Sequence, residues 1–352
     1  MVGPKETLSF NELEGWSDDS QTLALGAFKR SCARILKLNP DAPLDKKNDN
    51  ALYGRAGDWF EACRAVGSVS SNDGAARDYF ETYFVPVRFS ADEAGLFTGY
   101  YEPEMEGSLS RKGKFKTPIL SFPADFSSAQ ASGRTLPTRA EIEDDIKSGE
   151  IDADRSAVVW LADPVDAFFL HVQGSGRVSL DNGETLRVGF AAKNQRPYTS
   201  IGKLLIEKGA IPRDEVSMQT IRAWLAAHPA EVEPLLLQND SYIFFKVIQA
   251  DDHLGPPGAE GVSLTPQRSL AVDRSIHPTG SLFWLETTSP VPHSEGVEPF
   301  RHLVVAQDTG TAIRGVQRGD VFWGPGRDAA EIAGRMKQPG RLIALLPRAL
   351  AP

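Results

Sequence analysis

The sequence has few cysteines, no long apolar run and no excess of basic residues. Only Cys32 and Cys63 are present among the 352 residues, so one disulfide at most can form within the chain. Both cysteines fall at apolar positions of predicted helices, which favours two buried free thiols, with a disulfide as the alternative. No apolar segment approaches the roughly 20 residues of a membrane-spanning helix.

The charge balance argues against a nucleic-acid binder, and the scattered histidines argue against a zinc site. Lys and Arg number 38 against 47 Asp and Glu, a net charge of -9, which argues against a general nucleic-acid binder. The six histidines lie far apart, and neither C-x-x-C nor H-E-x-x-H occurs. The sequence therefore predicts no metal site and no cofactor.

The chain divides into a helical start and a strand-rich end. Apolar spacing predicts a helical layer over the first 85 or so residues, with helices at 21–36, 58–66 and 73–84. A strand follows at 96–103. The last 110 residues show short strands with Gly and Pro turns and one short helix at 329–337, a pattern typical of a small barrel. The best strands there are 242–247, 281–285, 303–306, 320–323 and 341–346.

The middle of the chain mixes both kinds of element. Thr138 and Glu141 form a capping box at a helix start, and helices are expected at 198–207 and 217–227. Segments 117–122, 157–161 and 166–172 are predicted as strands. Segments 177–180 and 185–190 flank Asn182-Gly183, which is a strong hairpin signal.

Three aspartates stand beside glycines at the ends of apolar strands: Asp273, Asp308 and Asp320. Burial at such a position favours the protonated carboxyl, and a neutral acid can donate a proton in glycoside cleavage. The alternative is that each aspartate caps a turn.

Two other segments are candidates for ligand contact. In Gly99-Tyr100-Tyr101-Glu102-Pro103, two aromatic side chains and an acid suit a wall for stacking on a sugar ring; the alternative is one buried and one exposed tyrosine of a strand. In the run from His171 to Arg177, glycines alternate with polar residues and permit close backbone approach to a ligand. A plain hairpin turn is the alternative there, and neither a phosphate loop nor a G-x-S-x-G serine elbow is present.

Taken together, seven segments resemble the membrane-bound lytic transglycosylase A family with its C-terminal three-aspartate ("3D") domain. They occur in order over about 230 residues, which is far more specific than any one of them. The segments are FTGYYEP (97–103), FFLHVQGSGRV (168–178), AAKNQRPYTSIGKLLIEKG (191–209), SMQTIRAW (217–224), NDSYIFFK (239–246), AVDRSIHPTGSLFW (271–284) and AQDTGTAIRGVQRGDVFWG (306–324).

The resemblance implies a mainly β fold with an N-terminal helical layer. A double-psi β-barrel domain would comprise residues 1–103 and 239–352, and a smaller β-rich domain, residues 104–238, would be inserted into it. The glycan would lie in a groove between the two domains.

The resemblance also implies a lytic transglycosylase that cleaves the β-1,4 MurNAc-GlcNAc bond of peptidoglycan and leaves 1,6-anhydromuramic ends. The family's single catalytic aspartate corresponds to Asp320, and Asp308 is its close partner. A lone acid suffices because the substrate's own C6 hydroxyl attacks, whereas ordinary glycosidases need two carboxylates. Asp308 is expected to raise the pKa of Asp320 by like-charge repulsion or to hydrogen-bond to it.

The same resemblance implies a set of substrate-binding residues on both sides of the groove. For Lys193 to Ser200 the alternative role is capping of a helix N-terminus. The expected set is Tyr100, Tyr101, Glu102, Gln173, Gly174, Ser175, Gly176, Lys193, Asn194, Tyr198, Ser200, Asn239, Ser241 and Asp273.

Two alternatives compete with this function: a glycan hydrolase on the same barrel, and a module that binds peptidoglycan without cutting it. The expected partner is the peptidoglycan glycan strand, bound by a monomer that associates peripherally with the envelope. The expected location is the periplasm or cell envelope, with outer-membrane association implied by the family. The chain itself shows no apolar signal core and no lipid-anchor cysteine near Met1.

Overall fold

The computed structural model describes residues 5–89, 95–249 and 254–351. The chain forms two compact units, one of residues 1–101 with 250–352 and the other of residues 102–249, so the second unit interrupts the first. The second unit is longer than the insertion expected at 104–238. Residues 239–249 belong to it because strand β9 (Ile243–Val247) pairs with β8 (Thr185–Lys193). The groove expected between the domains stays a prediction.

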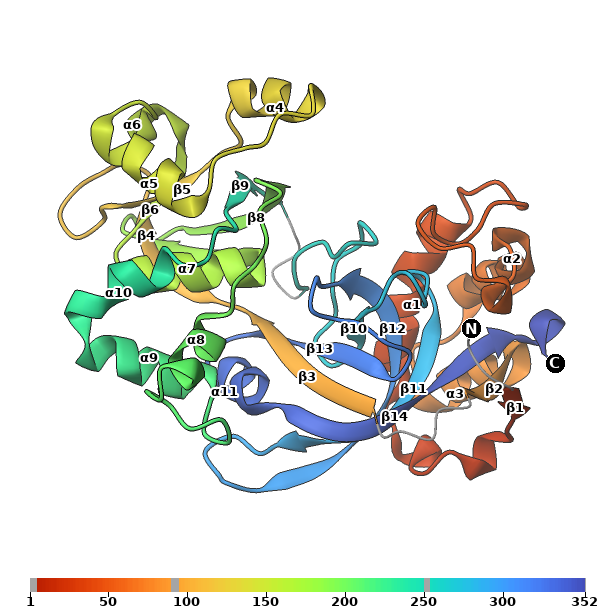
Figure 1. Ribbon diagram of the computed structural model, residues 1–352. Helices are drawn as coiled ribbons and strands as arrows, with labels where there is room; N and C mark the ends of the chain where they lie inside the picture. Colours follow the sequence, from red (N-terminus) through yellow and green to blue (C-terminus); the bar gives the residue numbers. More distant parts are fainter. Residues whose placement is uncertain (1–4, 90–94, 250–253, 352) are drawn as a thin grey trace. The chain divides into compact units, whose positions relative to one another are not determined.

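The first unit is built on a closed barrel of six strands. The order is β14-β11-β12-β10-β13-β3, and pairing of β3 with β14 closes the ring (Figure 1). Strands β10 and β12 run parallel, whereas β10 and β13 are antiparallel. This barrel and the inserted second sheet confirm the predicted fold class. The strand bounds are β3 Gly95–Glu102, β10 Ser269–Val272, β11 Leu282–Pro290, β12 Val297–Thr309, β13 Arg318–Pro325 and β14 Lys337–Pro347.

Strand β2 (Phe84–Phe89) extends the sheet beyond β14, and β1 (Lys5–Thr7) pairs with β2. On β11 the four consecutive residues from Leu282 to Leu285 are buried, so both faces of this strand are covered. A continuous apolar run is expected for a strand packed on two sides.

The predicted helical layer is confirmed as α1 (Gln21–Ile35), α2 (Ala56–Ala65) and α3 (Asp73–Tyr83). Phe28 on the buried face of α1 packs against Trp59, Phe80 and Phe84, with ring centroids 5.7–6.3 Å away. Each such buried aromatic contributes about 1.5–3 kcal/mol relative to exposure. The helix predicted at 329–337 is α11 (Arg327–Arg335). Among the described residues, no helix combines the length and the apolar character needed to cross a bilayer.

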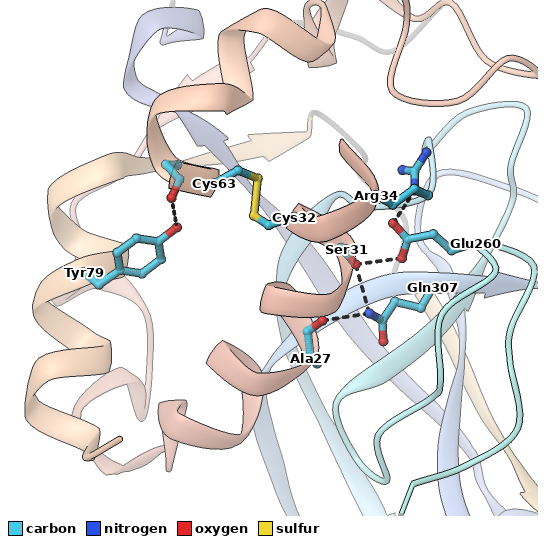
Figure 2. Close-up of a disulfide and its surroundings, with 9 residues drawn as sticks. Ala27, Ser31, Cys32, Arg34, Cys63, Tyr79, Glu260 and Gln307 are labelled. Atoms are coloured by element: carbon cyan, nitrogen blue, oxygen red, sulfur yellow. Dashed lines mark hydrogen bonds and ion pairs between the residues drawn. A yellow bond between two sulfur atoms is a disulfide. The ribbon is translucent and has the colours of Figure 1, made fainter. Parts of the chain in front are cut away.

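Cys32 and Cys63 form a disulfide, so the interpretation of both as free thiols was wrong. The two cysteines lie on the buried faces of α1 and α2, where these helices contact each other (Figure 2). Helical spacing identified the buried faces correctly. It carries no information on which buried positions of different helices meet, and this is why the pairing was missed.

The second unit has a six-stranded sheet in the order β5-β6-β4-β7-β8-β9. The predicted hairpin is confirmed: β7 and β8 pair antiparallel across a turn in which Gly183 has a φ of 88°. The other bounds are β4 Glu104–Ser108, β5 Thr117–Leu120, β6 Ala157–Leu161, β7 Ser175–Leu180, α4 Ala124–Ala131, α5 Arg139–Ser148, α6 Ala153–Ser156, α7 Pro164–Gln173, α8 Ile201–Glu207, α9 Met218–Ala227 and α10 Pro229–Leu236.

The strand predicted at 166–172 is wrong, because this segment lies within helix α7. Asp163 caps the helix by accepting the Val165 N–H at 2.8 Å, and Pro164 occupies the first helical position. Residues 167–171 are all buried, so every side of the helix is covered there. Such a run has no 3.6-residue periodicity, and apolar content alone cannot separate it from a buried strand.

Reducing the Cys32–Cys63 disulfide is expected to lower the free energy of unfolding by about 3–4 kcal/mol, since the bridge closes a separation of 31 residues in the unfolded chain. Urea unfolding with and without dithiothreitol measures the loss. The Cys32→Ser/Cys63→Ser variant is the control, and dithiothreitol should not change its midpoint. Equal stability of reduced and oxidised wild type would contradict the expectation.

Candidate active site

Two of the three aspartates lie on strands that flank β10 at the same level. Ala271 on β10 is the register partner of Asp308 on β12 and of Asp320 on β13. Neighbouring strands are about 4.7–4.9 Å apart and paired residues share a face. Both carboxyl groups therefore project from one face of the barrel wall, separated by the small side chain of Ala271.

Asp320 is held by a hydroxyl that an arginine orients in turn. Thr98 on β3 donates its Oγ1–H to Asp320 Oδ1 at 2.6 Å and accepts a hydrogen bond from Arg318 Nη2 at 2.9 Å. Among the described residues, no hydrogen bond to Asp320 Oδ2 is found. A proton on the neutral carboxyl is therefore expected on Oδ2, where a ligand can take it.

The environment of Asp320 keeps its proton at mildly acidic pH. Burial raises the pKa of Asp320 to about 6, and the negative charge of Asp308 adds to this effect. The Thr98 hydroxyl and the Arg318 guanidinium oppose the rise. Burial is the largest cause, so the like-charge repulsion expected from Asp308 is real but secondary. The residue remains partly exposed, which leaves the acid accessible.

Asp308 has three donors of its own. Tyr100 donates its hydroxyl to Oδ2 at 2.9 Å, while the Ala259 and Thr309 N–H groups donate to Oδ1, each at 2.9 Å. Burial still holds the pKa of Asp308 above its ordinary value. Burial and the nearby Asp308 charge raise the pKa of Tyr100 well above its usual range, so this phenol stays protonated and donates.

This pair of carboxyl groups suits proton transfer to a leaving group. A carboxyl with a pKa of about 6 is both a usable acid and, once deprotonated, a usable base near that pH. Among the described residues, no group of three or more His, Cys, Asp or Glu side chains is placed to hold a metal ion.

Asp273 lies one residue beyond β10 but has a different environment. Its carboxylate accepts the Ser275 Oγ–H at 2.6 Å, the Ser275 N–H at 3.1 Å and the Gly315 N–H at 2.9 Å. Burial acts to raise its pKa, but these donors and Arg314 outweigh burial and hold the pKa below its ordinary value. This geometry fits the turn-capping alternative better than substrate contact.

The expected aromatic wall is only partly present. Tyr100 is half-buried at the site, whereas Tyr101 is 7% exposed. In the second unit Glu102 is fully buried and pairs with Arg187 at 2.7 Å and Arg177 at 3.0 Å. Burial raises the pKa of Glu102 even against these two cations. The geometry therefore gives Glu102 a structural ion pair.

The run from Gln173 to Gly176 forms the end of α7 and the start of β7. The strand predicted before it is therefore absent, and so is the hairpin turn that was the alternative for this run. Gly174 ends the helix in the left-handed region at φ 78° and donates to Leu170 O at 2.8 Å. A Cβ on Gly176 would lie 2.6 Å from Met105 Cε. The backbone conformation of Gly174 and the close packing of Gly176 therefore explain why glycine occupies these two positions. Ser175 is the first residue of β7.

The remaining candidates lie in the second unit. The Asn194 amide donates to Pro137 O and Asp240 O, and Asn239 Oδ1 accepts from the Thr199 and Ser241 N–H groups. These side chains therefore support the backbone. Ser200 caps α8 by accepting the Lys203 N–H, as in the alternative for this segment.

Among these candidates, Tyr198 is the most exposed, and Lys193 ends β8 partly exposed. Ser241 is buried. The substrate-binding role of all these residues stays a prediction.

Sequence reasoning missed three groups of the site. Thr98 stands two residues before Tyr100 on β3, and Arg318 stands two residues before Asp320 on β13. Because side chains alternate along a strand, a period of two from the recognised residues could have found both. No sequence pattern indicated the contact of the Ala259 N–H with Asp308, because this contact depends on the path of a loop.

Two families match the chain: the MltA specific insert domain at residues 96–246 and the 3D domain at residues 268–346. Membrane-bound lytic murein transglycosylase A of Escherichia coli K12 is 37% identical over 254 residues, which are 71% of this chain and 65% of that protein. The matched part thus spans just under two thirds of this curated relative.

Solved structures extend the similarity to nearly the whole chain. A membrane-bound lytic murein transglycosylase from Agrobacterium tumefaciens is 32% identical, with a TM-score of 0.84, covering 99% of this chain and 98% of that one. E. coli MltA with bound chitohexaose is 28% identical, with a TM-score of 0.66, covering 98% and 92%.

Replacing Asp320 with asparagine is expected to stabilise the fold at pH 8 by up to about 3 kcal/mol, with little effect at pH 3.5. The folded-state pKa of about 6 exceeds the ordinary 3.8, so the stability that Asp320 contributes is present below pH 3.8 and lost as the pH rises through 6. Urea unfolding at both pH values measures the difference.

Asp273→Asn is the matched control of opposite sign. The pKa of Asp273 is lowered in the folded state, so its contribution is present above its ordinary pKa and lost as the pH falls through the folded value. This variant should therefore be destabilised at pH 8. The same sign for both variants at pH 8 would disprove the assignment of the two environments.

Proposed function

Because the chain belongs to the membrane-bound lytic murein transglycosylase A family, we propose that it is a lytic transglycosylase that cleaves peptidoglycan. The observation that carries the proposal is Asp320, a partly exposed carboxyl whose pKa burial raises to about 6 and whose Oδ2 takes no hydrogen bond from the described residues. Chitohexaose bound to E. coli MltA supports an oligosaccharide as the ligand class.

Asp320 acts as acid and then as base. Its carboxyl proton passes to the glycosidic oxygen as the bond from the MurNAc anomeric carbon to the GlcNAc O4 breaks. The resulting carboxylate then takes the proton of the MurNAc C6 hydroxyl while O6 bonds to the anomeric carbon. The proton returns to Asp320, no water is consumed, and the product is a 1,6-anhydromuramic end.

The second carboxylate of an ordinary glycosidase is not required as a nucleophile in this scheme. The attacking hydroxyl belongs to the substrate, so attack is intramolecular and its entropy cost is largely removed. Asp308 has a supporting role: its three donors fix its orientation, and its negative charge favours the positive charge that develops on the sugar ring.

The proposal also places the chain where peptidoglycan lies, in the cell envelope, with glycan strands as its partner and a monomer as the working form. The relatives named membrane-bound lytic murein transglycosylase support this location.

Digestion of purified sacculi tests the reaction. Wild type is expected to release soluble fragments with non-reducible 1,6-anhydro ends, detected by mass spectrometry. Asp320→Asn should release roughly a hundredfold to ten-thousandfold less, because the acid is lost. Asp328→Asn, an exposed aspartate on α11, is the matched control and should cleave like wild type. Reducing ends would instead show a hydrolase, and retained binding without products would show a binding module.

The pH dependence of turnover tests the role of Thr98. Turnover is expected to fall as the pH rises through about 6, because Asp320 loses its proton there. Thr98→Val removes a hydroxyl that lowers this pKa, so the alkaline limb should move to higher pH. Thr98→Ser keeps the hydroxyl and should keep the wild-type profile. A limb that moves to lower pH in Thr98→Val would refute the assigned role.

A further inference from the structure

The loop that contacts Asp308 is a compact structure of residues 255–264. Its arms are joined by hydrogen bonds from Gly255 N–H to Leu264 O at 2.8 Å and from Leu264 N–H to Pro256 O at 3.0 Å. Near its tip, Gly258 N–H donates to Val262 O at 3.0 Å. The tip therefore has a defined backbone path.

Two adjacent residues of the tip hold the end of β12. The Ala259 N–H donates to Asp308 Oδ1 at 2.9 Å, and the Glu260 N–H donates to Gln307 O at 3.0 Å. A Cβ on Gly258 would lie 2.4 Å from Gln307 O, so the loop approaches β12 as closely as backbone allows. Any withdrawal of the tip removes a donor from Asp308.

The Glu260 side chain fastens this tip to helix α1. Its fully buried carboxylate accepts the Ser31 Oγ–H at 2.7 Å and the Arg34 Nε–H at 2.9 Å (Figure 2). Ser31 also accepts a hydrogen bond at 2.9 Å from the Gln307 amide, which donates to Ala27 O at 3.0 Å. Helix α1 thus holds both the loop and the residue that precedes Asp308.

Arg34 is fixed from the other side by segment 279–280. Its Nη2 donates to Thr279 O at 2.9 Å and its Nη1 to Leu44 O at 2.9 Å. Gly280 has a φ of 94°, and a Cβ there would lie 3.0 Å from Arg34 Nη2 and 3.2 Å from Glu260 Oε1. This glycine makes room for the ion pair, a role that its sequence motif alone did not reveal.

We propose that Glu260 is a positioning residue, which fastens the 255–264 loop to helix α1 and thereby holds the Ala259 N–H on Asp308. The expected effect of Glu260 on turnover rests on the proposed function. Its expected effect on the hydrogen bonding of Asp308 does not. Without the Glu260 carboxylate, the tip loses its side-chain bonds to Ser31 and Arg34, while the backbone bond from Glu260 N–H to Gln307 O remains. Arg34 also loses its ion-pair partner, which is unfavourable for a mostly buried charge. The tip is then expected to shift, which weakens the Ala259 N–H bond and leaves Asp308 with two full donors.

The titratable and charged groups around this arrangement are few. Tyr100 on β3 and Asp320 on β13 face Asp308, while Arg34 on α1 and Asp45 act on Glu260. A substitution at Glu260 leaves Tyr100 and Asp320 in place but removes the ion-pair partner of Arg34. A change in the pKa of Asp308 is therefore compared between Glu260→Ala and Ser31→Ala, the second of which keeps this ion pair.

The test compares Glu260→Ala with Glu260→Gln, which keeps an oxygen for Arg34 and a polar group for Ser31. In Glu260→Ala the pKa of Asp308 is expected to rise further, because the Ala259 N–H lowers it, and kcat on sacculi should fall about tenfold with KM unchanged. Glu260→Gln should keep both the pKa of Asp308 and kcat close to their wild-type values. The carboxyl pKa is followed by carbon-13 NMR titration.

Glu286→Ala is the matched control. Glu286 is also a mostly buried glutamate, paired with Arg341 and bonded to the Trp284 indole, and it touches neither the loop nor Asp308. The Glu286→Ala variant should lose about as much free energy of unfolding as Glu260→Ala, with no change in kcat. Ser31→Ala, which leaves both charges of the ion pair in place, should shift the pKa of Asp308 in the same direction by less, and serves if Glu260→Ala does not fold.

An unchanged pKa of Asp308 in both Glu260→Ala and Ser31→Ala would overturn the proposal, as would an equal fall in kcat in Glu286→Ala. Failure of the proposed function looks different, since wild type itself would then yield no anhydro products while the NMR titration still reports the contact.

Discussion

The withdrawal of one carboxyl group from water is the constraint on which the site depends. Asp320 would be an ordinary acid in solvent, and burial is the largest cause that raises its pKa to about 6. The barrel supplies this environment because β10 lies between two strands that carry acids, with only Ala271 between their side chains. Thr98 and Arg318 then limit the rise, so that the group still releases its proton near neutrality.

Elements outside the barrel also contact the segments that carry the two acids, Asp308 and Asp320. The helical layer lies outside the two matched domains, yet α1 contacts β12 and carries the partners of Glu260. The disulfide between Cys32 and Cys63 fixes the helix one residue away from Ser31. A segment that carries no catalytic motif therefore contributes to the order of the acid pair through packing.

Much of the fold and part of the site could be predicted from the sequence, for identifiable reasons. Short apolar segments between Gly and Pro turns located the barrel strands, and helical spacing located α1 to α3. The position of Asp308 and Asp320 beside apolar strand residues indicated their burial. Asp273 shares the same local pattern, but its oxygens are taken by Ser275 and Gly315, a fact set by the path of a loop. Likewise, the burial of Glu102 follows from Arg177 and Arg187, two cross-strand neighbours far along the chain.

Strand β3 carries functional groups at every second position. Thr98 bonds to Asp320, Tyr100 bonds to Asp308, and the next residue of the series, Glu102, is the carboxylate anchored by two arginines. Because side chains alternate strictly, a deletion or insertion of one residue would turn whatever lies beyond it to the opposite face. A substitution on this strand changes one contact at a time, whereas a change in its length would displace several of these bonds together.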